Sequence, residues 1–475
     1  MSPKLLKDGT VITFDENQKK VKVLPKASIL IVGDTISAIE EDFNKISVPS
    51  DTEIIDVSNK IVSPGFINTH LHAWQTAYRS IAPDVTLVHY FDWLSQMSNV
   101  ARTAFTPEDI YISTLEGYLE GLNGGVTSYV DHAHNNWGAE IMKKGFEATV
   151  DSGARVWWCY EPFGSEKFPV EEHWKVYEDL SSRPRPDTVA LGLSIGMGTQ
   201  GSEEKLQQTK SMIRKLDVKA ITTHHLGGPW SSHLTSPPEL EEQGFYSLNI
   251  PVILSHAPYL TEKDQNALKD HNMSVSITPE SEFHYGHGQT TGHQILPNAS
   301  LGVDTNFTFS GDILTQARLW LQRTRDVGFS AQLKDTGLLP RTTPMTVEQG
   351  FLLATRQGGK ALWRDDIGML TVGAKADIVV FDGSSPNMLG WSNAVAAVML
   401  HANVGDIEHV LVGGEFRKRD FRLVGMKMQW EVVKKRFLET AKRIQSQAFP
   451  PPPVTEKLWG FKPTGEGQVY STIER

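Results

Sequence analysis

The alternation of apolar and polar positions separates two strand-rich chain ends from a long middle part. Residues 1–63 contain short β-branched runs, such as "ASILIVGDTISAIE", that Gly-Asp and Asn turns interrupt, and they show no helical period. Residues 368–429 return to this pattern, with strands expected in "ADIVVFDGSS" and over 395–419. We therefore expect the two ends to combine into one small β-sandwich.

The middle part, residues 64–367, alternates short β-branched runs with amphipathic stretches of helical length. Eight successive strand–helix units are what a (β/α)8 TIM barrel requires. The predicted fold class is therefore α/β, a (β/α)8 TIM barrel with a small β-sandwich domain built from both chain ends. The expected strands are "GFINTHLH", "GVTSYVDHAH", "ARVWWCYEPF", "TVALGLSIGM", "KAITTHHLG", "PVILSHAP", "MSVSITPE" and "ASLGVDTNF", and the expected helices cover 107–122, 138–152, 202–215, 261–271, 311–326 and 346–362.

The last part of the chain, residues 430–475, differs in its sequence pattern from both the barrel and the sandwich. It begins with a basic helical stretch, "WEVVKKRFLETAKRIQSQ", and continues into the proline run "FPPPP". A proline run of this kind is extended and carries no internal hydrogen bonds. We expect this part to be a C-terminal helix followed by a packing arm or a subunit contact, and the protein to form a homo-oligomer, a dimer or a tetramer.

Composition and charge narrow the classes of function. The 475 residues include one cysteine, Cys159, which excludes an intrachain disulfide framework and thiolate-rich zinc sites. A net charge of −10 disfavours nucleic acid and anionic membranes as partners. The N-terminus lacks a signal-peptide core, and no apolar run approaches the roughly 20 residues of a spanning helix. We expect a cytoplasmic protein whose metal ligands, if any, are His and carboxylate.

Histidine and aspartate concentrate at the ends of the expected strands, where ligand-binding residues of such a barrel lie. His70 and His72 close the first strand, and residues two apart share one face of a strand. Three imidazoles and one carboxylate around Zn²⁺ or Fe²⁺, with one position left for water, make an open catalytic site. The other candidates are His224 and His225 in "TTHHLG", His256 in "LSHAP" and Asp304 in "LGVDTN".

These motifs resemble the amidohydrolase superfamily, in particular its branch of cytosine deaminases, guanine deaminases and atrazine chlorohydrolases. The similarity runs from residue 1 to about 420. It is carried by "PGFINTHLHAWQT", "GVTSYVDH", "ITTHH", "ILSHAP", "LGVDTN" and the late stretch from "TVEQGFLLATRQGGKAL" to "IGMLTVGAKADIVVFD".

The resemblance implies a divalent metal ion bound by His70, His72, one histidine of the fifth strand and Asp304. His224 is preferred there, because strand alternation then turns Ile221 towards the helices, and His225 is the alternative. The two-metal branch of the family needs a bridging lysine on the third or fourth strand, and neither run offers one. We therefore expect a single ion, Zn²⁺ before Fe²⁺.

The resemblance also assigns roles around the ion. His256 would polarise the substrate and orient the attacking water, and Asp304 would take the proton of that water. Trp74 and Gln75 would lie along the pocket rim and contact the substrate. His134, Trp230 and His287 complete the expected substrate-binding set, with His134 preferred to its neighbour His132.

The chain departs from the family at one position. Deaminases of this branch carry H-x-x-E at the fifth strand, where the glutamate moves protons to the leaving amine. Here Gly227 or Gly228 takes that place, and neither can transfer a proton. Glu280 is the catalytic replacement that we favour from the sequence, with Glu282, His134 and His287 as the other candidates.

The predicted function is that of a mononuclear metal-dependent amidohydrolase, a hydrolase acting on carbon–nitrogen bonds other than peptide bonds. Its expected substrate is a small ring-containing molecule with an amide, lactam or amino-heterocycle. The missing glutamate leaves a dehalogenating or lyase-type reaction at the same site open. A barrel that binds a ligand and retains its metal without catalysis is the alternative from another class of protein.

Overall fold

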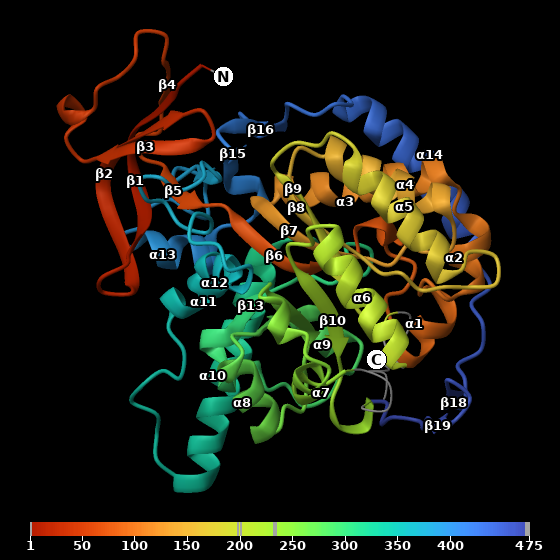
Figure 1. The fold of residues 1–475 in the computed structure, drawn as a ribbon. Helices are drawn as coiled ribbons and strands as arrows, with labels where there is room; N and C mark the ends of the chain where they lie inside the picture. The colour runs from red at the N-terminus through yellow and green to blue at the C-terminus, as the bar shows by residue number, and fades with distance from the viewer. Residues whose placement is uncertain (1, 197–198, 200–201, 231–234, 471–475) are drawn as a thin grey trace, which may run out of the picture.

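The computed structural model describes residues 2–196, 199, 202–230 and 235–470. Within these ranges, eight parallel strands form one sheet in the order β13-β12-β11-β10-β9-β8-β7-β6. The predicted TIM barrel is thereby confirmed, and Figure 1 shows its strands enclosed by helices. The fourth expected strand is shorter than predicted, and its last residue, Met197, lies outside the described residues. The bounds are β6 Phe66–Leu71, β7 Val126–Ala133, β8 Arg155–Tyr160, β9 Val189–Ser194, β10 Ile221–His225, β11 Val252–His256, β12 Ser274–Ile277 and β13 Ala299–Leu301.

The barrel closes where the segment after β13 meets the end of β6. A parallel bridge pairs Leu71 with Asp304. The backbone N–H of His72 donates to the carbonyl of Asp304 over 2.8 Å, and that of Val303 donates to the carbonyl of His70 over 3.1 Å. The first and last strands of the barrel are therefore joined at their carboxyl ends, where the site was expected.

Helices cover the outside of the barrel at the predicted places. Thr106 caps the N-terminus of α3 reciprocally with Asp109, and Pro107 occupies the first helical position, which together explain why the helix begins there. The stretch 346–362 is two helices separated at Thr355 rather than one. The helices are α1 Leu87–Trp93, α2 Asn99–Ala104, α3 Pro107–Asn123, α4 Ala139–Asp151, α5 Val170–Ser182, α6 Glu203–Lys215, α7 Pro237–Glu242, α8 Glu262–Asp270, α9 Pro279–His284, α10 Ile313–Thr336, α11 Val347–Ala354 and α12 Arg356–Ala361.

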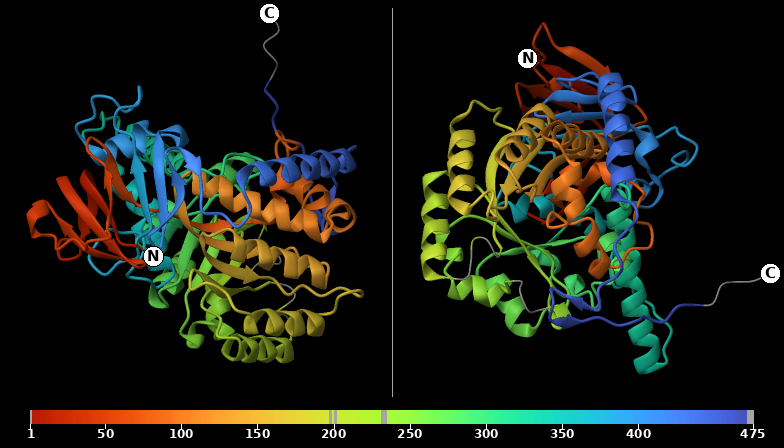
Figure 2. Two further views of the ribbon diagram at one scale, coloured as in Figure 1. Left: turned by 90° about the horizontal axis from the view of Figure 1, so that it is seen from above. Right: turned by 90° about the vertical axis from the view of Figure 1, so that its right-hand side faces the viewer.

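Strands from both chain ends form one β-module beside the barrel, as predicted. Nine strands of the described chain hydrogen-bond in the order β17-β16-β15-β14-β5-β1-β2-β3, with β4 paired to β1. Red N-terminal and blue C-terminal strands lie together in Figure 2. Apolar side chains from both ends, among them Val62, Ile378 and Leu411, share one buried cluster. The strands are β1 Lys4–Asp15, β2 Lys20–Val32, β3 Thr35–Glu40, β4 Glu53–Asp56, β5 Ile61–Pro64, β14 Ile378–Phe381, β15 Ile407–Val412, β16 Glu415–Arg419 and β17 Arg422–Leu423.

The expectation of strands throughout 395–419 was wrong for its first part. Residues 394–401 are helical, as α13 Ala394–Ala396 followed by a π-helical turn over Ala397–His401. The apolar residues Val395, Val398 and Met399 are all buried. A short run of buried apolar residues is compatible with a helix as well as with a strand, so the pattern did not distinguish the two.

A buried ion pair joins the barrel to the β-module. The guanidinium of Arg155, at the start of β8, donates from Nε to Asp377 Oδ2 over 2.7 Å and from Nη2 to Asp377 Oδ1 over 3.1 Å. The backbone N–H of Gly413 donates to the same carboxylate over 2.7 Å. Asp377 is the aspartate of "ADIVV", so the late sequence motif marks this junction and not the functional site.

The C-terminal part forms a helix and an arm that crosses the barrel. Helix α14 (Trp430–Ala448) packs against α3, and Trp93 of α1 donates from its indole to the carbonyl of Ala448 over 2.8 Å. The arm then passes His89, whose Nε2 lies 2.8 Å from the carbonyl of Pro452. It forms a small hairpin of β18 Lys457–Leu458 and β19 Lys462–Pro463 (Figure 1).

The subunit count stays a prediction, which light scattering would measure. None of the helices in the described part of the chain is both long enough and apolar enough to cross a membrane.

We expect Asp377→Asn to destabilise the protein by on the order of 3 kcal/mol, because it leaves the Arg155 charge buried without its partner. Thermal and denaturant unfolding measure the change. Asp326→Asn is the matched control, since it breaks the exposed pair with Arg323 and should cost less than about 1 kcal/mol. Equal effects of the two substitutions would contradict the proposed junction.

Candidate active site

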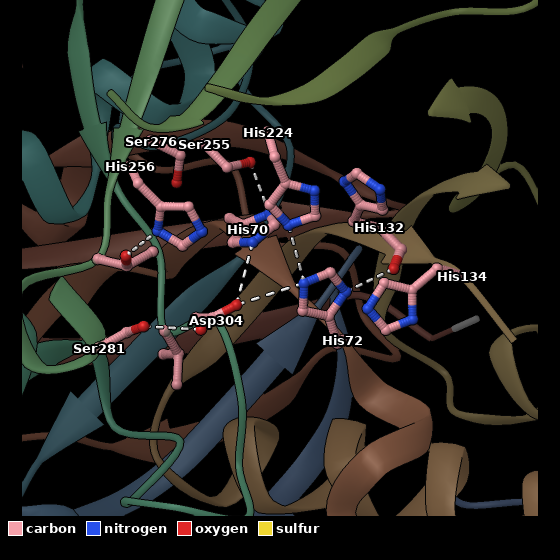
Figure 3. Close-up of polar contacts among 12 residues, drawn as sticks. His70, His72, His132, His134, His224, Ser255, His256, Ser276, Ser281 and Asp304 are labelled. Carbon is pink, nitrogen blue, oxygen red and sulfur yellow. Dashed lines mark hydrogen bonds and ion pairs between the residues drawn. The ribbon is translucent and has the colours of Figure 1, made fainter. Parts of the chain in front are cut away.

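Four of the expected metal-binding side chains converge at the carboxyl end of the barrel (Figure 3). They come from β6 and the residue after it, from β10, and from the segment after β13. Their ligand atoms all lie within 4.8 Å of one another. Asp304 Oδ1 lies 3.2 Å from His70 Nε2 and 3.3 Å from His72 Nε2, and His72 Nε2 lies 3.2 Å from His224 Nε2.

The protonation of the rings suits a cation at this point. His72 Nδ1 lies 2.8 Å from the backbone carbonyl of His132, and a carbonyl only accepts hydrogen bonds. Nδ1 of His72 therefore carries a proton, and Nε2 is the nitrogen that faces Asp304 and His224. Burial lowers the pKa of His70 to about 4, so that ring is neutral at pH 7. Three imidazole nitrogens and a carboxylate oxygen are a donor set for Zn²⁺ or another divalent transition metal.

Neighbouring side chains fix the ligands in place. Ser281 of α9 donates from Oγ to Asp304 Oδ2 over 2.7 Å, and Ser255 Oγ lies 2.7 Å from His70 Nδ1. Burial opposes the ionisation of Asp304, but the contacts of His70 and His72 hold its pKa well below its usual range. Asp304 is therefore a carboxylate with one oxygen aimed at the histidines and the other held by a hydroxyl.

The backbone turns sharply at two of the site residues. His256 has a φ of 72° and Asp304 a φ of 73°, which lie in the left-handed region that residues with a Cβ rarely adopt. Each residue stands at the end of a barrel strand, and the turn takes the chain out of the sheet there. Such strain persists where the surrounding structure enforces it, and it is common at functional sites.

The second histidine of the fifth strand points away from this group. His225 is buried, and its Nδ1 lies 3.1 Å from the carbonyl of Thr235. Strand alternation therefore places His224, and not His225, with His70 and His72, in the arrangement that we preferred from the sequence.

His256 lies beside the metal-binding group without belonging to it. Its Nδ1 lies 2.6 Å from Thr278 Oγ1, and its ring stacks on His224 with the centroids 5.5 Å apart. The Thr278 contact occupies Nδ1, so Nε2 is the nitrogen that can act in the cavity.

A cavity of about 280 Å³ opens above the histidines. Its walls are mainly aromatic and aliphatic, and neither lysine nor arginine occurs among its described lining residues. His72, His134, His224, His256, His287 and Asp304 line it together with Leu87, Tyr90, Phe91, Gln96, Met97, Glu161, Phe163, Ile195, Gly196, Thr223, Leu226, Thr235, Tyr285 and Trp459.

Three residues expected to contact the substrate lie behind the cavity wall instead. The indole of Trp74 donates to His134 Nδ1 over 2.7 Å, and Gln75 Nε2 donates to the hydroxyl of Tyr90 over 3.0 Å. Trp230 donates from its indole to the carbonyl of His287 over 3.1 Å. Each of the three therefore supports a neighbour that does line the cavity.

Glu280 does not reach the cavity either. Its side chain turns to α10, where Gln316 Nε2 donates to Glu280 Oε2 over 2.8 Å. Glu282 is buried, and its Oε1 accepts the backbone N–H of Thr278 over 2.8 Å. Burial raises the pKa of Glu282 to about 8, but this residue is not part of the described lining. Neither carboxyl group is therefore placed to donate a proton in the cavity.

Among the lining residues that the sequence did not indicate, Glu161 and Trp459 bear most on the function. Glu161 follows the last residue of β8, and its position at a strand end in "WWCYEPF" was the available signal. Trp459 belongs to the C-terminal arm, beyond the region of family resemblance. Its ring centroid lies 5.4 Å from that of Phe91, and no pattern in the sequence indicated this contact.

Comparison with known proteins identifies the family. Residues 61–417 match the sequence profile of the amidohydrolase family. The chain belongs to this family. The resemblance drawn from the motifs is therefore confirmed.

Relatives and solved structures agree with the family. A 5-methylthioadenosine/S-adenosylhomocysteine deaminase of Thermococcus sibiricus is 27% identical over 433 residues, which are 86% of this chain and 93% of that enzyme. A zinc-bound adenosine deaminase from Xanthomonas campestris has a similar fold, with a TM-score of 0.76 and 16% identity over 94% of this chain and 99% of that chain. A zinc complex of atrazine chlorohydrolase from Arthrobacter aurescens also has a TM-score of 0.76, with 22% identity over 92% of this chain and all (100%) of that chain.

We expect His72→Ala to lose the bound metal and His225→Ala to retain it, because only the former removes a nitrogen from the convergent group. Elemental analysis of the purified variants measures the metal, and circular dichroism verifies that both fold. Retention of metal by His72→Ala would contradict the proposed metal-binding group, and loss of metal from His225→Ala would contradict the choice of His224 over His225.

Proposed function

We propose that the protein is a metal-dependent hydrolase that cleaves a C–N bond in a small, flat, uncharged heterocycle. One observation carries the proposal: the group formed by His70, His72, His224 and Asp304 opens directly into an aromatic-lined cavity. A ligand set with a free side towards a cavity is typical of catalytic and not of structural metal sites.

A single ion fits the residues present. The group offers four ligand atoms, and the cavity residues that the structure describes include no lysine to bridge two ions. Zinc is the ion bound in the solved adenosine deaminase and atrazine chlorohydrolase. Such an ion supplies Lewis-acid chemistry, which acidifies water and polarises the bond under attack.

The protein's own groups are arranged for hydrolysis around this point. Asp304 is ionised and held by Ser281, so it is placed to accept the proton that an attacking water loses. His134 accepts the indole N–H of Trp74 at Nδ1, so its neutral ring carries the proton on Nε2 and can donate it to a substrate atom. His256, at the end of β11, adds another ring nitrogen to the cavity lining.

The cavity walls indicate the class of substrate. Phe91, Tyr90 and Trp459 provide flat apolar surfaces of the kind that pack against rings. The described lining offers no lysine or arginine that would neutralise a phosphate or carboxylate. These features favour an uncharged amino-heterocycle. The adenosine derivatives named for several relatives and the atrazine named for a structural neighbour also contain an amino-substituted ring.

Ammonia and amine release from a panel of aminopurines, aminopyrimidines and aminotriazines tests the proposal. We expect turnover that a chelator abolishes and added zinc restores. Halide release from chlorinated rings without any amine release would favour a dehalogenase instead. Full metal occupancy without turnover on the panel would favour a binding protein.

We expect Trp459→Ala to raise KM about three- to tenfold with little change in kcat, because it removes an aromatic wall worth roughly 0.5–1.5 kcal/mol. Steady-state kinetics on the best substrate measures this split. Phe461→Ala in the same hairpin is the matched control, since its half-exposed ring is not part of the described lining. An unchanged KM in Trp459→Ala would show that the C-terminal arm does not contribute to substrate binding.

A further inference from the structure

The fifth strand cannot supply the proton-transferring side chain that related deaminases place there. A Cβ atom on Gly227 would lie 2.7 Å from the carbonyl oxygen of Pro258, and one on Gly228 would lie 2.7 Å from the ring of Tyr259. Gly228 also has a φ of 56°, a conformation that favours glycine. The segment after β10 is therefore shaped for residues without side chains, and a glutamate would require it to move.

Glu161 brings a carboxyl group into the same cavity from another strand end. Its backbone is held on both sides: its N–H donates to the carbonyl of Ala133 over 3.2 Å, and its carbonyl accepts Asn136 Nδ2 over 3.2 Å. The side chain lines the cavity with His72 and His134. The carboxyl is thus positioned by backbone contacts and remains free to act.

No protein group within the described chain satisfies this carboxyl. Its Oε2 is shielded from solvent and has no hydrogen-bond partner among the described residues. The neighbouring Gly196 makes room for the other oxygen, because a Cβ atom there would lie 3.1 Å from Glu161 Oε1. An unsatisfied carboxyl beside a ligand cavity is costly unless a ligand completes it.

The surroundings also favour a carboxyl that exchanges its proton near neutral pH. Burial raises the pKa of Glu161 to about 7, and His72 opposes this shift only in part. Neither lysine nor arginine is part of the described lining to hold the group ionised. A proton carrier works best when its pKa lies near the working pH.

We propose that Glu161 delivers the proton to the departing nitrogen, in the role that a strand-five glutamate fills in related deaminases. This inference rests on the proposed function. Water forms the new C–O bond, the C–N bond breaks, and the carboxyl proton of Glu161 passes to the nitrogen. The proton that water loses then returns to Glu161, so that R–NH₂ and H₂O give R–OH and NH₃ with no other reactant.

Glu161→Gln keeps the shape of the side chain and removes the exchangeable proton. We expect kcat for amine release to fall at least about 100-fold, the usual size of a general-acid effect. The metal content should equal that of the wild type. Chloride departs without a proton. For a substrate with the same ring and chloride as leaving group, provided that the wild type turns it over, kcat of Glu161→Gln should therefore fall less than about threefold.

Glu166→Gln is the matched control, because Glu166 is exposed in the segment that follows Glu161 and does not line the cavity. It should leave both reactions unchanged. Glu161→Ala provides a second variant, in which added formate should restore part of the lost rate. Infrared difference spectra supply a readout without turnover: at pH 6 the wild type should show a protonated-carboxyl band that Glu161→Gln lacks.

The outcomes separate this inference from the proposed function. Wild-type rates of amine release in Glu161→Gln, or no Glu161-dependent infrared band, would overturn the role of Glu161 and leave the hydrolase assignment intact. Equal losses for amine and chloride release would also overturn it, because they would indicate a structural effect. A wild type that releases no amine from any member of the panel would overturn both.

Discussion

The closure of the barrel between β6 and the segment after β13 determines where the chemistry is placed. The backbone N–H groups of His72 and Asp304 donate to the carbonyls of Asp304 and His70 over 2.8 and 2.9 Å. These two hydrogen bonds bring together ligands that lie more than 200 residues apart in the sequence. Because the same peptide units carry the ligating side chains, the geometry of the metal-binding group follows from the pairing of the first and last strands.

Much of this arrangement follows from the period of a β-strand. Alternation predicted that His70 and His72 share a face and that His224 rather than His225 joins them, and the structure places all three rings accordingly. The eight strands were recognisable because each is a short β-branched run that ends in a change of pattern. Hydrophobic period and composition describe a single strand or helix. They therefore predicted the strands and the direction of the side chains on them.

Residues beyond the strand ends were harder to place. Trp74 and Trp230 stand in 3-10 turns, Ala73–Tyr78 and Gly228–Trp230, where a period of two no longer gives the direction of a side chain. Both therefore support lining residues instead of lining the cavity. Glu280 was favoured for its position after a strand, yet it lies on α9 and turns to Gln316. Glu161 follows a mostly apolar third strand without histidine, so the pattern of strand-end histidines did not indicate it.

Different parts of the chain form the floor and the walls of the cavity. The barrel strands supply the polar groups at its floor, whereas α1, its neighbouring loop and the C-terminal arm supply most of the apolar wall. Trp459 stands outside residues 61–417, the region that matches the family. Substitutions in this arm can therefore change the cavity wall without changing the strands that hold the metal-binding group. A truncation that removed Trp459 would open one side of the cavity and leave residues 61–417 untouched.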